Sequence, residues 1–278
     1  FLNFEKFFVT IYSNRNLEYL LNIDSKNYKV IYSDITDSKV YDELVDHDII
    51  YHLAQLNLGQ TKNIKKDFSI NSLPCAKLVE FCIKNKKKPK IVFASSYNLT
   101  RTLKVSPPSI WSLHKYFGEQ YLGYFREYFE ANTIVVRIGN VYGVPVNSKK
   151  IFNSSINKIH NTAKNGSITL YKNSNLLRSF VHVEDLVRCL FAFHNFPEFK
   201  LPSLCYASEL QLCNYEEIAQ ILIQNLESKG RDVKLINNND ELSRIEMYAD
   251  KVQSPNIFNM LAINPKWSVK KYLCNHLL

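Results

Sequence analysis

Short apolar runs alternate with longer segments of helical periodicity along the first half of the chain. β-branched and aromatic residues concentrate in short stretches, as is typical of strands. We predict strands over 8–12, 29–32, 48–53, 91–94 and 133–137. Apolar residues three and four positions apart predict a helix over 75–83 and a long amphipathic helix over about 110–129.

This alternation of strands and helices predicts an α/β protein with a mostly parallel sheet, because βαβ units connect parallel strands. Past residue 144 the pattern loosens into shorter elements near 168–171, 185–193 and 215–226. We therefore expect a first domain over 1–144 and a smaller lobe over 145–278, some segments of which return to the sheet. Polar residues at the strand ends mark the edge where ligands bind in such sheets.

Composition narrows the class of protein. With 278 residues, 46% hydrophobic and 22% charged, the chain can bury a sizeable core. A fibre, a disordered chain and a disulfide-stapled mini-protein are excluded. There are only 7 glycines, about a third of average usage, which weighs against a glycine-rich phosphate loop within these residues.

The net charge is +9, which suits nucleic acid, an anionic membrane or an anionic small substrate. The densest basic run, 84–90, falls where a helix ends before the strand at Ile91. Lysines there complement the helix dipole, so we interpret the run as a solvated turn. Nucleic-acid binding ranks last, because the run lacks interleaved aromatic residues.

Six scattered cysteines without a C-x-x-C pair indicate free thiols in a reducing cytosol. No apolar run approaches the roughly 20 residues that cross a bilayer, and no cluster has metal-ligand spacing. We therefore expect a cytoplasmic protein without a membrane or metal site. The first residue is Phe1 rather than Met, so the true N-terminus is expected to lie upstream.

Eight segments, in order, carry a family resemblance. They are Ser33–Asp37 (S-D-I-T-D), His52–Ala54 (H-L-A), Asn71, Phe93–Ser96 (F-A-S-S), Lys115–Glu119 (K-Y-F-G-E), Arg137–Gly143 (R-I-G-N-V-Y-G), Arg178–Asp185 (R-S-F-V-H-V-E-D) and Asn264–Trp267 (N-P-K-W). Together they resemble the extended short-chain dehydrogenase/reductases, in particular the NAD-dependent nucleotide-sugar epimerase/dehydratase family. The resemblance implies a Rossmann-like, doubly wound parallel sheet: an N-terminally incomplete dinucleotide-binding domain with a smaller C-terminal substrate lobe.

The resemblance also implies the site residues. In the family a strand-end Ser and a Tyr-x-x-x-Lys helix act together on a sugar hydroxyl, and Ser96 and Lys115 match two of these positions. The implied cofactor-binding residues are Ser13, Asn14, Arg15, Asp34, Ile35, Leu53, Ala54, Asn71 and Lys115. The implied substrate-binding residues are Ser96, Asn140 and Arg178.

The catalytic Tyr position is Trp111. Indole has an N–H donor but no acidic proton and no basic nitrogen, so it cannot shuttle a proton. His114, Tyr97 or Tyr116 are alternative proton carriers, although a helix-surface or core role is the more favoured interpretation of all three. Trp111 could instead cover the nicotinamide or the sugar as an apolar plate.

Two further departures concern the cofactor. The family's opening strand and G-x-x-G-x-x-G phosphate loop are not among these residues, and we favour a truncated sequence or gene over a redesigned site. Ser13 replaces the Asp that NAD-preferring members place on the ribose, and Arg15 is nearby. Without that carboxylate the 2′-phosphate of NADP would be tolerated, so the cofactor is NAD or NADP; a plain turn at these residues is the equally favoured alternative.

The remaining polar residues have two interpretations each. By resemblance Arg178 faces the nucleotide diphosphate; a salt bridge to Glu184 or Asp185 is the alternative. His52 and His182 are interpreted as hydrogen-bonded framework residues rather than catalysts.

The favoured function is an NAD(P)-dependent nucleotide-sugar epimerase/dehydratase-like protein of surface-polysaccharide sugar metabolism, with a nucleotide sugar as substrate. The alternative is a non-catalytic descendant that binds a sugar nucleotide or a partner subunit. A homodimer through the helix around 111–129 is a family expectation.

Overall fold

The structure, a computed structural model, describes residues 7–14, 28–56, 63–102, 109–143, 156, 159, 162–163, 165–196, 202–238 and 251–276. The chain divides into two compact units. The first comprises Phe1–Arg137 and Phe191–Cys205, and the second comprises Ile138–Leu190 and Tyr206–Leu278.

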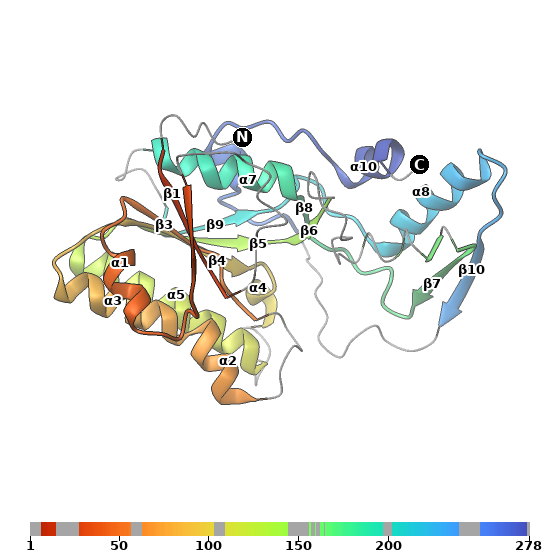
Figure 1. Ribbon diagram of the computed structural model, residues 1–278. Helices are drawn as coiled ribbons and strands as arrows, with labels where there is room; N and C mark the ends of the chain where they lie inside the picture. The colour runs from red at the N-terminus through yellow and green to blue at the C-terminus, as the bar shows by residue number, and fades with distance from the viewer. Residues whose placement is uncertain are drawn as a thin grey trace. The chain divides into compact units, whose positions relative to one another are not determined.

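The first half of the chain alternates strands and helices as predicted (Figure 1). Its elements are β1 (Val9–Ser13), β2 (Tyr28–Tyr32), α1 (Lys39–Leu44), β3 (Ile49–His52), α2 (Ile64–Asn71), α3 (Leu73–Lys84), β4 (Lys90–Ser96), α4 (Leu99–Thr102), α5 (Ile110–Phe129) and β5 (Thr133–Ile138). The 3₁₀ turn η1 (Phe193–Asn195) and β9 (Leu204–Ala207) follow later in the chain.

The sheet of this half is parallel. β3 pairs in parallel with β4, and the four-stranded order is β3-β4-β5-β9. Hydrogen bonds from Val135 to Ser203 and from Gly139 to Ala207 advance together along β5 and β9, as in a parallel pair. The predicted α/β fold with a parallel sheet is confirmed.

The strands β1 and β2 pair in parallel with each other in a separate two-stranded sheet. Every residue of β1 is only half-buried, whereas β4 is buried along nearly its whole length. Continuous burial is typical of a strand that is covered on both faces. Among the described residues, β4 is therefore at the centre of the core and β1 is not.

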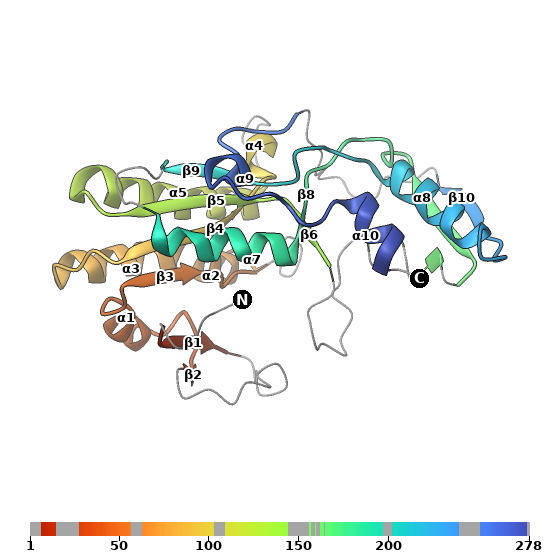
Figure 2. The ribbon, with the colours of Figure 1, turned by 90° about the horizontal axis from the view of Figure 1, so that it is seen from above.

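Helix α5 spans the predicted range, and its ends have clear causes. The Ser109 hydroxyl accepts a hydrogen bond from the Ser112 backbone N–H at the start, and Glu130 adopts a left-handed conformation at the end. Helices α3 and α5 pack side by side against β4 (Figure 2). At Gly118 an added Cβ would lie 3.0 Å from the Phe93 ring, so the absence of a side chain permits this close packing.

The opposite face of α5 leaves four aromatic side chains at least one-third exposed: Phe117, Tyr121, Tyr124 and Tyr128. The homodimer expected through this helix stays a prediction.

Lys90 corrects the interpretation of the basic run as a solvated turn. Residues 84–88 are exposed, but Lys90 is 7% exposed. Its Nζ donates to the carbonyls of Phe193 (3.0 Å), His194 (3.3 Å) and Phe196 (3.1 Å). The buried ammonium therefore gives a charged donor to three carbonyls at and just past the end of the preceding helical segment.

The second unit contains shorter elements. They are β6 (Asn140–Tyr142), β7 (Ser167–Tyr171), β8 (Phe180–His182), most of α7 (Val183–Ala192), α8 (Tyr215–Glu227), β10 (Lys234–Asn238), α9 (Ile257–Met260) and α10 (Val269–His276). Strands β6 and β8 form one parallel pair, and β7 and β10 form another. Helix α8 covers β7 and contacts α10 around a second hydrophobic core.

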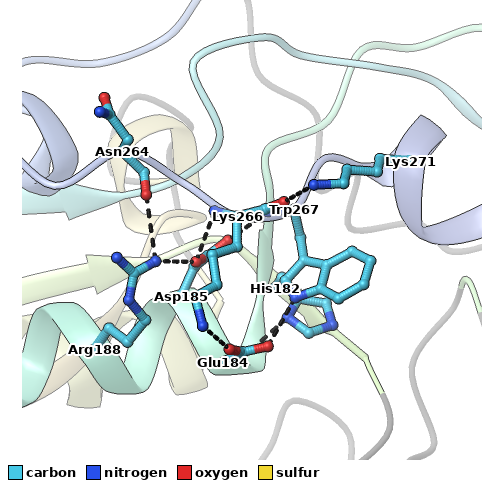
Figure 3. Close-up of polar contacts among 8 residues, drawn as sticks. All are labelled: His182, Glu184, Asp185, Arg188, Asn264, Lys266, Trp267 and Lys271. Atoms are coloured by element: carbon cyan, nitrogen blue, oxygen red, sulfur yellow. Dashed lines mark hydrogen bonds and ion pairs between the residues drawn. The ribbon is translucent and has the colours of Figure 1, made fainter.

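Asp185, at the start of α7, binds the segment that precedes α10 (Figure 3). This carboxylate is 1% exposed and accepts the backbone N–H groups of Lys266 and Trp267, both at 2.9 Å. It also pairs with Arg188 at 2.9 Å, while Glu184 accepts the Lys266 ammonium at 2.7 Å. Two of the segments that carry the family resemblance, Arg178–Asp185 and Asn264–Trp267, are thus in direct contact although they lie far apart in the sequence.

The six cysteines are free thiols, four of them buried. Within the described part of the chain, no helix combines the length and the apolar character needed to cross a membrane.

Candidate functional site

The carboxyl ends of the first three strands carry most of the predicted cofactor residues. Ser13 ends β1 and Asn14 follows it, while Asp34 and Ile35 lie two and three residues past the end of β2. The exposed Asp34 carboxylate accepts the Thr36 backbone N–H (2.8 Å) and hydroxyl (2.7 Å). These hydrogen bonds and one to Asn14 lower the pKa of Asp34. Arg15 lies outside the described residues.

The loop Leu53–Leu56 follows β3 and is exposed through Gln55. Both backbone polar groups of its last residue, Leu56, are hydrogen-bonded to side chains. The Leu56 N–H donates to Asn71 Oδ1 at 2.9 Å, and the Leu56 carbonyl accepts from Trp111 Nε1 at 2.8 Å. Trp111 is 8% exposed. The indole is therefore more than the apolar plate that the sequence suggested, because its N–H holds a backbone carbonyl.

His114 lies one turn beyond Trp111 on α5 and is 5% exposed. Its Nδ1 contacts Asp67 Oδ1 at 2.7 Å. The same oxygen accepts Asn71 Nδ2 at 3.1 Å. The sequence did not single out Asp67; its position four residues before Asn71 becomes informative only once both are known to lie on α2. A buried histidine bound to a carboxylate matches the core role better than the role of a proton carrier open to a ligand.

Lys115 is enclosed between α5 and β4. It is 1% exposed, its Nζ donates to the Ala94 carbonyl at 2.7 Å, and it lies 4.6 Å from the centre of the Phe93 ring. Burial lowers the pKa of Lys115 to about 8, although Cys75 and nearby carboxylates act in the opposite direction. The Lys115 ammonium thus already has a hydrogen-bond acceptor within the protein.

Two serines end β4 in different environments. Ser96 is half-buried, and its Oγ accepts the Asn98 backbone N–H at 3.3 Å. Ser95 is 4% exposed and donates to Glu119 Oε1 at 2.5 Å. Glu119 also accepts Arg137 through two hydrogen bonds of 3.0 and 2.7 Å. Of the two hydroxyls, that of Ser96 is the more accessible.

His52 corrects one interpretation. It is buried at 7% exposure, but its Nδ1 has no hydrogen-bond partner, so it is not a satisfied framework residue. Burial and then the positive Lys115 lower the pKa of His52 to about 3. A neutral imidazole is therefore expected at physiological pH.

The predicted substrate residues Asn140 and Arg178 belong to the second unit. Asn140 is half-buried and its Nδ2 donates to the Ser179 carbonyl at 2.9 Å. Arg178 is 3% exposed, donates to the carbonyls of Asn173 and Leu176, and lies 4.1 Å from the centre of the Tyr215 ring. Much of its guanidinium hydrogen-bonding capacity is therefore used within this unit.

Glu209 is a titratable group that the sequence gave no reason to select. It is 7% exposed and accepts hydrogen bonds from the Tyr142 hydroxyl and from the Val269 N–H, the latter at 3.2 Å. Burial, helped by Asp185, raises the pKa of Glu209 to about 7, although both hydrogen bonds oppose this shift. Glu209 therefore changes charge near neutral pH.

We predict that Glu209 makes the protein less stable as the pH rises from about 4.5 to about 7. In that range the unfolded chain has already released the proton that the folded state retains, so folding weakens by up to about 3 kcal/mol. Glu209→Gln removes this titration and keeps hydrogen-bonding atoms. Urea unfolding at about pH 5 and pH 8 measures the free energy of unfolding of both proteins. From about pH 5 to about pH 8 this free energy should fall more in the wild type than in Glu209→Gln. The same difference in free energy of unfolding between the two proteins at both pH values would contradict the shifted pKa.

No group of three metal-ligating side chains occurs in the described ranges. What the geometry offers is a row of exposed strand ends, an accessible serine, an enclosed lysine and an indole that binds the neighbouring loop.

Comparisons with known proteins bear on the family and on the fold of the chain. The model of the NAD dependent epimerase/dehydratase family matches residues 7–203. A Methanocaldococcus jannaschii protein named "Putative UDP-glucose 4-epimerase" is 28% identical over 184 residues, which is 60% of this chain and 59% of that protein. The chain thus spans less than two thirds of the length of this curated relative.

Two solved structures share the fold. The UDP-glucose 4-epimerase of Thermotoga maritima with UDP-glucose has a TM-score of 0.78 at 17% identity, over 98% of this chain and 90% of that one. The UDP-glucuronic acid 4-epimerase of Bacillus cereus in complex with NAD has a TM-score of 0.74 at 16% identity, over 98% and 90%.

Proposed function

The chain belongs to the NAD dependent epimerase/dehydratase family, and on that premise we propose that it binds a nicotinamide dinucleotide, NAD or NADP, together with a nucleotide sugar. The observation that carries this proposal is that largely exposed residues, with Asn14 and Asp34 as polar members, follow the carboxyl ends of β1 and β2 in one parallel sheet and of β3 in another. In an open parallel sheet this edge is where nucleotides bind. A place in surface-polysaccharide sugar metabolism belongs to the same proposal.

The described residues fit one end of the dinucleotide better than the other. Asp34 and the exposed loop Leu53–Leu56 offer polar groups and open backbone to an adenosine. At the nicotinamide end, Trp111 has no ionisable proton, and Lys115 is sealed against Ala94. We infer that these residues bind and orient ligands, but that position 111 contributes no acid or base.

A non-catalytic sugar-nucleotide-binding protein is therefore the second candidate. Two observations favour it: the indole N–H of Trp111 is already donated to Leu56, and Lys115 is 1% exposed. The two candidates share the same ligands and differ only in turnover.

Calorimetric titration of the full-length gene product with NAD, NADP and UDP-glucose tests the binding that both candidates require. We expect saturable binding of at least one dinucleotide. Asp34→Ala should weaken it about fivefold, the effect of about one lost hydrogen bond. Asp37→Ala, which removes an exposed carboxylate from the same turn, should leave the affinity unchanged. Absence of dinucleotide binding by the wild type would overturn the proposal.

A further inference from the structure

A closed series of hydrogen bonds joins the loop Leu53–Leu56 to two helices of the first unit. From α5, Trp111 donates to the Leu56 carbonyl, and the Leu56 N–H donates to Asn71 on α2. Asn71 donates to Asp67, which contacts His114, back on α5. Starting and ending on one helix, the series fixes both polar groups of a single peptide residue.

All the side chains of this series are buried: Trp111 at 8%, Asn71 at 2%, Asp67 at 6% and His114 at 5% exposure. Breaking a hydrogen bond between buried groups is energetically costly, because no water replaces the lost partner. Leu53, at the other end of the loop, is 51% exposed. The series therefore anchors one end of a loop whose remainder is open to a ligand.

We propose that Trp111 is a positioning residue that fixes the loop Leu53–Leu56 in the conformation that receives the dinucleotide. This inference rests on the proposed function, because the loop is one of the predicted cofactor contacts. It assigns to the tryptophan a role that needs no proton transfer. Trp111 then acts through the Leu56 backbone and not on the reacting atoms.

Trp111→Phe tests the proposal, because it keeps an aromatic ring and removes the N–H. The matched control is Trp267→Phe, which changes the only other tryptophan and lies in the second unit. Hydrogen exchange of the Leu56 amide, followed by NMR, should become about tenfold faster in Trp111→Phe. The amide of Ile91 in β4 should be unaffected, and affinity for NADH should fall about fivefold.

Asn71→Leu removes the anchor on the other side of the same residue and should give the same pattern, so the proposal stays testable if Trp111→Phe fails to fold. Unchanged exchange at Leu56 in a folded Trp111→Phe variant would overturn the positioning role, whatever the chain binds. Faster exchange in a protein whose wild type binds no dinucleotide would support the anchor and refute the proposed function. The two failures are therefore distinguishable.

Discussion

Trp111→Tyr is expected to raise the rate at which the full-length gene product interconverts a nucleotide sugar and its epimer by ~10²–10⁴-fold. A phenol at position 111 supplies the ionisable proton that indole lacks. Lys115 lies one turn away, and its positive charge would favour the phenolate. UDP-glucose and dTDP-glucose are the substrates to test, with product ratios measured by NMR.

Trp111→Phe is the matched control for this gain, because it provides a ring without an acidic proton. It should weaken dinucleotide binding without raising turnover, whereas Trp111→Tyr should raise turnover even if binding weakens. Equal rates for the tyrosine and phenylalanine variants would contradict the view that proton transfer is the missing step. A wild-type rate already in the usual range of epimerases would contradict it as well.

Arg137→Met is expected to reduce the free energy of unfolding by about 3–5 kcal/mol, because it leaves a buried carboxylate without its cation. Arg137 and Glu119 are 9% and 6% exposed and share two hydrogen bonds. Urea denaturation followed by circular dichroism measures the loss.

Arg137→Met combined with Glu119→Gln separates the two causes of this loss. The neutral glutamine removes the uncompensated charge and can still accept the hydrogen bond from Ser95. The double variant should therefore recover at least half of the stability lost in Arg137→Met. A loss below about 1 kcal/mol in the single variant would show that the pair behaves like an exposed ion pair.

The sequence predicted the regular elements well, because their signals are local. Helix α5 begins and ends where its periodicity indicates, at Ile110 and Phe129. The order of strands β1 to β5, with helices α3 and α5 among them, followed from these patterns, whereas α1 and α4 were not predicted. Helix α2 was not predicted, even though Asn71 at its end had been selected as a candidate residue.

Partners of long side chains could not be read from the sequence, because they depend on distant backbone. Lys90 stands in a basic run, yet its ammonium binds carbonyls about a hundred residues away. The same holds for Glu209: burial and the nearby Asp185 raise its pKa, and its hydrogen-bond donors are the distant Tyr142 and Val269. The local sequence shows which side chains can donate or accept, whereas the fold determines which partner each of them contacts.

At the candidate site, the substitution of Trp111 was visible in the sequence but its consequence was not. That position 111 has no ionisable proton follows from the chemistry of indole alone. The hydrogen bond to Leu56 required the loop and the helix to be placed together.

The central claim, that the strand ends beside Trp111 receive a nicotinamide dinucleotide, is tested most directly by the fluorescence of Trp111 itself. In Trp267→Phe, Trp111 is the single tryptophan of these 278 residues, so titration of this chain with NADH reports on this one position. The account predicts saturable quenching with energy transfer to the bound nicotinamide, reversed by an excess of NAD or NADP. Fluorescence that shows no saturable change, in a protein confirmed to be folded, would contradict it.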